Sequence, residues 1–303
     1  MGMLLAASPV FDFLQQVISG AASGMVYASL ALALVLIYRA MDVANFAQGE
    51  MAMFATFVAY SLITGLHVPF FVAFVITVLL AFVGGVVVER TVMRPFEDAT
   101  VLTLVIVTLG LFSIFNGLAG FIWGYVSKSF ESPFPGADAV HMGPLFIGYQ
   151  DLGVTVVTLV VLAVVFLFFR FTKLGLAMRA AALYPESSRL LGVRTNWMLA
   201  LGWGLSSAVG AVAGMMVAPI VSLDPNFMQA VLLFAFVAAV LGGIESPVGA
   251  VVGGVLTGVL LALVGTYLPG GQDLRIPFGL VVIVVVLLVR PAGLFGRAEA
   301  RRV

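Results

Sequence analysis

Charge is scarce in this chain of 303 residues, and cysteine is absent. The lack of cysteine excludes disulfides, thiolate metal sites and thiol nucleophiles. Only 9% of the residues are charged, whereas a soluble domain carries about a quarter. A chain with so few charges cannot cover a surface that faces water, so we expect lipid to be its main solvent. The net charge is zero and no basic block occurs, so nothing indicates a nucleic acid partner.

The sequence also lacks the residue patterns of an enzyme. Its two lysines follow Ser127 and Thr172, so neither completes a phosphate-binding loop, and we predict that the chain does not hydrolyse ATP by itself. The two histidines, His67 and His141, fall in predicted loops and do not form a metal site. The apolar stretches contain no catalytic triad and no pair of acid/base carboxylates. A membrane enzyme is therefore disfavoured, and no cofactor is predicted.

Long apolar runs dominate what is present, since 62% of the residues are hydrophobic and the mean hydropathy is +1.20. A transmembrane helix needs about 20 apolar residues. The stretches without charge are 13–38, 51–88, 99–127, 152–169, 195–223, 225–244, 246–272 and 276–289. The stretch 51–88 is long enough for two helices, with a turn near Pro69. We therefore predict an all-α polytopic membrane protein with about nine transmembrane helices, within a range of about eight to ten.

The distribution of basic residues predicts the orientation of these helices. With nine spans, the two termini lie on opposite sides, and placing the C-terminus in the cytoplasm gathers most of the basic residues there. These residues are Arg39, Arg90, Arg94, Arg170, Lys173, Arg179, Arg189, Arg194, Arg290, Arg297, Arg301 and Arg302. Only Lys128 and Arg275 then lie on the outer side. We expect the N-terminus outside and the C-terminus in the cytoplasm.

The whole chain, 1–303, is expected to form a single transmembrane domain with two distinctive loops. The outer loop 125–150 contains Pro133, Pro135 and Gly136 and is expected to be irregular. The cytoplasmic segment 170–194 contains two helix-forming runs separated by Pro185, which favours a pair of short amphipathic helices at the membrane surface.

Small residues recur four positions apart in several of the predicted helices. The pairs are Gly20/Gly24, Gly120/Gly124, Gly210/Gly214, Gly249/Gly253 and Gly254/Gly258. Such faces let helix backbones approach closely in a membrane, so they predict a tightly packed bundle.

The segment NFAQGE, residues 45–50, is the most polar stretch beside a predicted membrane span. A carboxylate deep in the bilayer is costly, so Glu50 is expected near the membrane interface or facing a wet cavity. Two interpretations remain open for Asn45, Gln48 and Glu50. They cap the start of a helix, whose dipole also favours an acid there, or they line a transport pathway.

Four motifs in order resemble one known family. They are NFAQGE at 45–50, AMRAAALYPESSRLLGV at 177–193, VLGGIESPVGAVVGGVLTG at 240–258 and LLVRPAGLFGR at 287–297. Each is similar to a motif of the LivH-type permease subunits of branched-chain amino acid ABC transporters. Two departures stand out. Leu183 and Tyr184 stand in the part of the segment where relatives usually carry Asn or Asp. Glu245 stands where an uncharged residue is more common, and it forms either a local salt bridge or, as we favour, a contact with the cytoplasmic interface.

The resemblance implies a membrane-spanning half of an ATP-driven importer in the bacterial inner membrane, carrying branched-chain amino acids or related small solutes. The implied partners are a related M-type permease subunit, two cytoplasmic ATPase subunits and an external binding protein. The implied pathway residues are Asn45, Gln48, Gly49 and Glu50. The implied ATPase-coupling residues are Arg179, Ala181, Pro185, Glu186, Arg189 and Gly192. The alternative is an ion-coupled secondary transporter or a channel, which the lack of ionisable residues in most spans disfavours.

The coupling segment is expected to present two kinds of surface. Arg179, Glu186 and Arg189 are expected to face water or a partner. Ala181, Leu190 and Leu191 are expected to form an apolar ridge that fits a groove on a soluble partner.

Overall fold

The computed structural model describes residues 9–41, 43–97, 99–134, 139–142 and 144–296. Pro135, Gly136, Arg297, Arg301 and Arg302 lie outside these ranges. The helices are α1 (Pro9–Met41), α2 (Gln48–Tyr60), α3 (Phe70–Val88), α4 (Val101–Trp123), α5 (Tyr149–Phe171), α6 (Lys173–Leu183), α7 (Pro185–Leu190), α8 (Thr195–Val221), α9 (Phe227–Gly242), α10 (Pro247–Tyr267) and α11 (Gly271–Val289). Short π turns, Ser61–Gly65 and Glu89–Met93, extend α2 and α3, and a 3-10 turn follows at Arg94–Phe96. The prediction of an α-helical membrane protein is confirmed.

Seven of the helices in the described ranges are long and apolar enough to cross a membrane. They are α1, α3 with its extension, α4, α5, α8, α10 and α11. At 1.5 Å per residue, α2 and α9 are only about 20 to 24 Å long, shorter than a hydrocarbon core of about 30 Å. The predicted count of nine spans depends on how these two short helices are placed in the bilayer.

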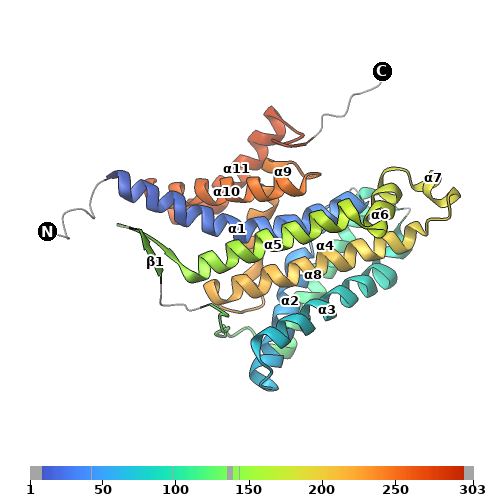
Figure 1. The fold of residues 1–303 in the computed structure, drawn as a ribbon, viewed down its shortest axis with the longest axis horizontal. Helices are drawn as coiled ribbons and strands as arrows, with labels where there is room; N and C mark the ends of the chain where they lie inside the picture. The colour runs from blue at the N-terminus through green and yellow to red at the C-terminus, as the bar shows by residue number, and fades with distance from the viewer. Residues whose placement is uncertain (1–8, 42, 98, 135–138, 143, 297–303) are drawn as a thin grey trace.

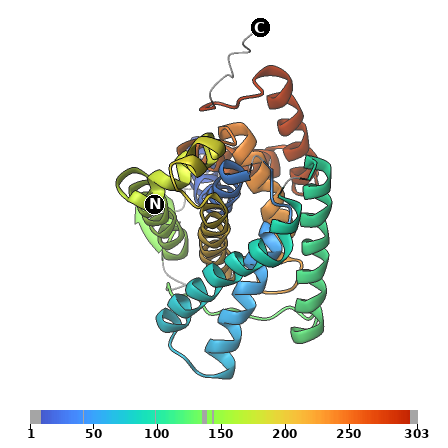
Figure 2. The same cartoon turned by 90° about the vertical axis from the view of Figure 1, so that its right-hand side faces the viewer.

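Helices α1 and α8 form the centre of the bundle, and the other membrane-length helices surround them (Figures 1 and 2). Most of the central window of α1 and of α8 is buried, whereas α3, α4, α5 and α11 are largely exposed. Their exposed side chains are mainly Val, Leu, Ile and Phe, as a lipid-facing surface requires. Seen from the α6–α7 end, α4 and α5 lie on opposite sides of the bundle (Figure 2).

Glycines permit a close contact between α1 and α10. A Cβ atom added at Gly254 would lie 2.6 Å from the Cα of Ala28, and one added at Gly258 would lie 2.4 Å from the Cα of Gly24. No larger residue fits such a backbone approach, so these glycines pack as predicted. This close approach stabilises the helix pair mainly through van der Waals contacts. The hydrophobic effect contributes little, because lipid tails are as apolar as the helix surface. The predicted pair Gly120/Gly124 does not pack in this way, because a Cβ atom at Gly124 would meet open space and one at Gly120 would meet only the Tyr125 side chain.

The two ends of the bundle differ. The N-terminal end of α1 and a hairpin of β1 (Ala139–Met142) and β2 (Leu145–Gly148) lie at one end, and α6 and α7 lie at the other (Figure 1). The expectation that 125–150 is irregular was incomplete, because four antiparallel residue pairs join these strands. Gln15 of α1 holds the hairpin, since its side chain accepts from the backbone N–H of Phe146 and donates to its carbonyl.

Candidate functional site

The polar segment 45–50 lies inside the bundle. Gln48 contacts Ser206, eleven residues beyond the start of α8, which is about 16 Å along that helix. Ser206 in turn contacts Ala33, eight residues before the end of α1. At its other end α2 leads into Ser61, whose hydroxyl accepts a hydrogen bond from the indole of Trp123 at the end of α4. Helix α2 therefore begins at depth in the bundle and runs toward one of its ends.

No side chain of this segment caps α2 through a hydrogen bond at the N-cap, although Glu50 lies in the first turn, where an acid complements the helix dipole. The N-cap residue of α2 is Ala47, which has no side-chain hydrogen bond of its own. The carboxamide of Asn45 accepts from the N–H of Ala47 at 3.0 Å, so it shapes the turn before the helix. The side chains of Gln48 and Glu50 point to other helices instead.

Gln48 joins three helices through a buried network. Its Nε2 donates to the carbonyl of Ser206 at 3.2 Å, and the Ser206 hydroxyl lies within donating distance of both Gln48 Oε1 (3.0 Å) and the carbonyl of Ala33 (2.6 Å). Gln48 is 0% exposed. A Cβ atom at Gly210 would come within 2.5 Å of Gln48 Nε2, so this glycine provides the space for the amide. Burying such groups is tolerated because each is hydrogen-bonded.

Gly49 and Glu50 face the α9 and α4 side. A Cβ atom at Gly49 would lie 3.1 Å from the Cβ of Leu232, so α2 approaches α9 closely at this point. Glu50 is 1% exposed, so its side chain is buried within the bundle. Its carboxylate accepts from Asn116 Nδ2 of α4 at 3.4 Å and from the side chain of Gln229 of α9. The expectation that Glu50 faces a wet cavity stays a prediction, and such a cavity would lie on the α4 and α9 side of the molecule.

Sequence reasoning missed the residues that surround Glu50. Asn116, Asn226 and Gln229 come from positions 66 to 179 residues further along the chain. Only one signal pointed to them, namely that Asn116 and Gln229 are amides within otherwise apolar helices. Amides in a membrane helix seek a partner inside the protein, but the sequence does not identify that partner.

The segment 170–194 forms two helices, α6 and α7, that break at Pro185 as predicted. Pro185 is the first residue of α7, where the missing N–H costs nothing. Gly192 follows α7 with a φ of +84°, a conformation that favours glycine and reverses the chain toward α8. These two residues set the shape of the segment.

The predicted apolar ridge of this segment is partly wrong. Ala181 is buried against the bundle at 8% exposure, so it faces the protein and not a partner. Leu190 and Leu191 are 90% and 85% exposed, and Leu183 and Tyr184 are also exposed. Large apolar side chains therefore protrude from α6, α7 and their connections, whereas Ala181 packs against the bundle.

The charged residues of the segment 170–194 differ in exposure and in their partners. Glu186 is exposed, as expected. Arg189 is exposed but has partners inside the chain, since it donates to Thr195 at 2.9 Å and forms an ion pair with Glu97 at 3.4 Å. Arg179 is half-buried, and its Nε atom is buried without a partner in the described residues, which corrects the expectation that it faces water. Glu245 is exposed, and among the described residues it forms no ion pair.

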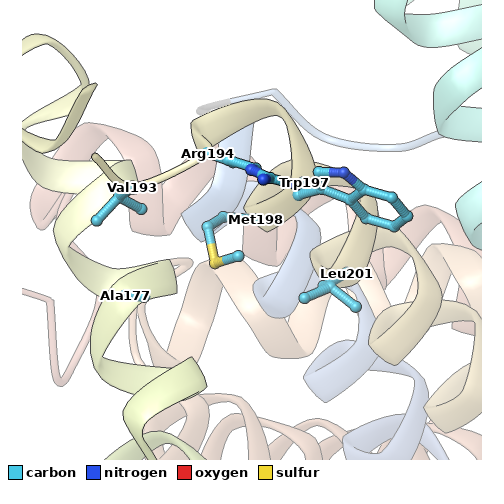
Figure 3. A pocket seen from close by; sticks show the side chains of 6 residues that line it. All are labelled: Ala177, Val193, Arg194, Trp197, Met198 and Leu201. Carbon is cyan, nitrogen blue, oxygen red and sulfur yellow. The ribbon is translucent and has the colours of Figure 1, made fainter.

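An open pocket of about 490 Å³ lies beside this segment, between α6 and the start of α8 (Figure 3). It is lined by Ala177, Val193, Arg194, Trp197, Met198 and Leu201. The guanidinium of Arg90 stacks on the Trp197 ring at 3.5 Å from its centroid, which fixes the indole at the rim. The pocket is apolar and belongs to the surface that α6 and α7 present.

A bundle of membrane-length helices with a buried polar site at depth and a separate apolar surface at one end defines a multi-pass membrane transport subunit. Comparison with known proteins gives the family. A family model described as "Branched-chain amino acid transport system / permease component" matches residues 16–289. The chain belongs to this family of permeases.

Individual relatives agree over nearly the whole chain. The chain is 31% identical to the high-affinity branched-chain amino acid transport system permease protein LivH of Escherichia coli K12, covering 96% of this chain and 98% of that protein. It is 30% identical to the corresponding BraD protein of Pseudomonas aeruginosa, covering 97% and 99%. A solved structure of PsaBC from Streptococcus pneumoniae in complex with Fab aligns with a TM-score of 0.46 at 13% identity, over 93% of each chain.

Proposed function

We propose that this chain is one permease subunit of an ATP-driven importer for branched-chain amino acids or related small solutes, and that it forms half of the translocation pathway. The observation that supports this most strongly is the match of one family over nearly the whole chain, including relatives named as branched-chain amino acid permeases. The subunit itself is not catalytic. ATP hydrolysis occurs on two separate cytoplasmic subunits, an M-type permease completes the pore, and an external binding protein delivers the solute.

The translocation pathway passes the start of α2, at Asn45, Gln48, Gly49 and Glu50. The depth of these residues supports the assignment, because Gln48 and Glu50 contact the middle parts of α8 and α4. Within this set the roles differ. Gln48 is enclosed by α1, α2 and α8 and holds the path in shape, whereas Glu50 and Gly49 lie toward α4 and α9.

The ATPase subunits dock on the segment 170–194. The exposure of Leu190 and Leu191 supports this, because side chains so apolar are rarely left in water without a partner. Pro185 and Gly192 shape the segment, Glu186 contacts the partner, and Arg189 holds α7 to Glu97 and Thr195. Arg179 and Ala181 support the segment from its buried side.

The subunit is a single membrane domain in the bacterial inner membrane, with its N-terminus outside and its C-terminus in the cytoplasm. The charge distribution supports this orientation, since α6 and α7 carry basic residues at the end opposite the hairpin. A reporter active only in the cytoplasm and fused after Val303 is expected to be on, as is a reporter active only outside and placed near Ser132. Both sites on one side would contradict the nine-span arrangement.

Uptake by the reconstituted complex tests the function itself. Vesicles that contain both permeases and both ATPases, with binding protein outside and ATP inside, are expected to accumulate leucine. Omission of ATP is expected to abolish uptake. Uptake that needs an ion gradient and not ATP would overturn the proposal in favour of a secondary transporter.

A further inference from the structure

Glu50 lies beside three amide side chains that reach the surface of the bundle between α4 and α9. Asn116 is half-buried, and Asn226 and Gln229 are exposed. Asn116 is seven residues before the end of α4, about 10 Å along the helix, whereas Asn226 lies in the turn directly before α9. The opposite sides of the bundle present Val72 and Leu79 on α3 and Val160 on α5, which are apolar.

Hydrogen-bond acceptors outnumber donors in this cluster. Asn116 Nδ2 has two hydrogens and lies near three oxygens, the carboxylate of Glu50 (3.4 Å), the carbonyl of Pro225 (2.8 Å) and Oδ1 of Asn226 (3.1 Å). Gln229 Nε2 also donates to Asn226 at 2.9 Å. A carboxylate can accept about four hydrogen bonds, and Glu50 receives donors from only two shared amides. The cluster is short of donors.

Among the described residues, no basic side chain forms an ion pair with Glu50. The single ion pair among the described residues lies elsewhere, between Arg189 and Glu97. A buried carboxylate is normally paired, because removing an unpaired charge from water is costly. The start of α2 gives Glu50 partial compensation through the helix dipole, since Glu50 is in its first turn. A mobile cation with several N–H donors would supply both the missing charge and the missing donors.

We propose that Glu50, Asn116, Asn226 and Gln229 form a binding site for the ammonium group of an α-amino acid on its way through the membrane. An ammonium group has three donors, which match the oxygens of Glu50, Asn226 and Pro225. The site rests on the proposed function, and it adds that the pathway recognises the charged end of the solute.

The absence of native cysteine allows a direct test in the assembled importer, independent of transport. Ala230 is exposed and lies one helical turn beyond Asn226, on the same face of α9, so Ala230→Cys places a thiol beside an intact site. Val160→Cys on the apolar face of α5 is the matched control. Reactions with a cationic and an anionic methanethiosulfonate reagent report water access and local charge.

The Ala230→Cys thiol is expected to react much faster than the Val160→Cys thiol, and about fivefold faster or more with the cationic reagent than with the anionic one. Adding Glu50→Gln is expected to remove that preference. Leucine is expected to slow the reaction, and its deaminated 2-oxo acid is expected not to. Equal rates for both reagents, protection by the 2-oxo acid, or protection by sodium chloride alone would each overturn the ammonium site. Leucine uptake by the unmodified importer would still support the proposed function in those cases.

Discussion

The start of α2 and the segment α6–α7 expose opposite kinds of side chain. At the start of α2, polar groups are enclosed, and Gln48 is 0% exposed. On α6–α7, apolar groups protrude, and Leu190 is 90% exposed. The first region finds its hydrogen-bond partners on α1, α4, α8 and α9, so this chain alone completes most of it. The second has no cover among the described residues. The fold therefore encloses the polar side chains of the first region and leaves the apolar side chains of the second exposed.

The largest effect of a substitution is expected on the exposed apolar side chains of α6–α7. The pair Leu190→Asp and Leu191→Asp removes two exposed anchors, each worth about 2 kcal/mol at an interface, so ATPase affinity is expected to fall roughly a thousandfold. Co-purification of the ATPases measures it. Leu66→Asp, an exposed leucine in the turn before α3, is the control and is expected to leave recovery unchanged. Undiminished recovery with the double variant would show that the ATPases bind elsewhere.

Removing the charge of Glu50 tests whether the start of α2 takes part in transport or has only a structural role. Glu50→Gln keeps the size and the amide contacts but removes a charged acceptor, which is worth about 1.5 to 3 kcal/mol. Leucine uptake is expected to fall at least about tenfold, with the complex still assembled. Glu245→Gln, the same change at an exposed carboxylate, is expected to transport normally. Normal uptake by both variants would leave Glu50 a structural role only.

Helix packing around the enclosed region gives a smaller and purely structural effect. Gly254→Ala places a Cβ 2.6 Å from the Cα of Ala28, so α1 and α10 must separate at a cost of about 1 to 3 kcal/mol. A lower melting temperature of the purified complex is expected. Gly117→Ala on α4 meets open space and is expected to be neutral or slightly stabilising. Equal melting temperatures for the two variants would contradict the central position of the α1–α10 contact.

The smallest effect is expected at the ion pair that ties α7 to the end of α3. The Arg189 and Glu97 side chains are 57% and 25% exposed, and such a pair contributes less than about 1 kcal/mol. Glu97→Gln is therefore expected to change uptake and ATPase recovery by less than about twofold. Glu131→Gln, an exposed carboxylate near the hairpin, is the control. A loss as large as that of the leucine pair would mean that the ion pair, and not the apolar surface, sets the coupling.

Sequence patterns predicted the elements of both regions but not their surroundings. The break at Pro185 was predicted from the sequence, because proline interrupts a helix. The turn at Gly192 has an equally local cause, because its positive φ favours glycine. Ala181 was assigned to the outer ridge because helical spacing gives a face but not its direction. The hairpin at 139–148 was missed because four-residue strands give little periodic signal.

The sequence by itself determined that lipid is the main solvent, that the chain is helical and that small residues let several helices pack closely. These properties depend on composition and on residues within a few positions of each other. Only the tertiary structure decided that Glu50 lies at depth, that Asn116, Asn226 and Gln229 surround it, and that Leu190 and Leu191 protrude while Ala181 does not. The physical reason is that burial and hydrogen-bond partners depend on which distant helices pack together, and many packings satisfy the same apolar pattern.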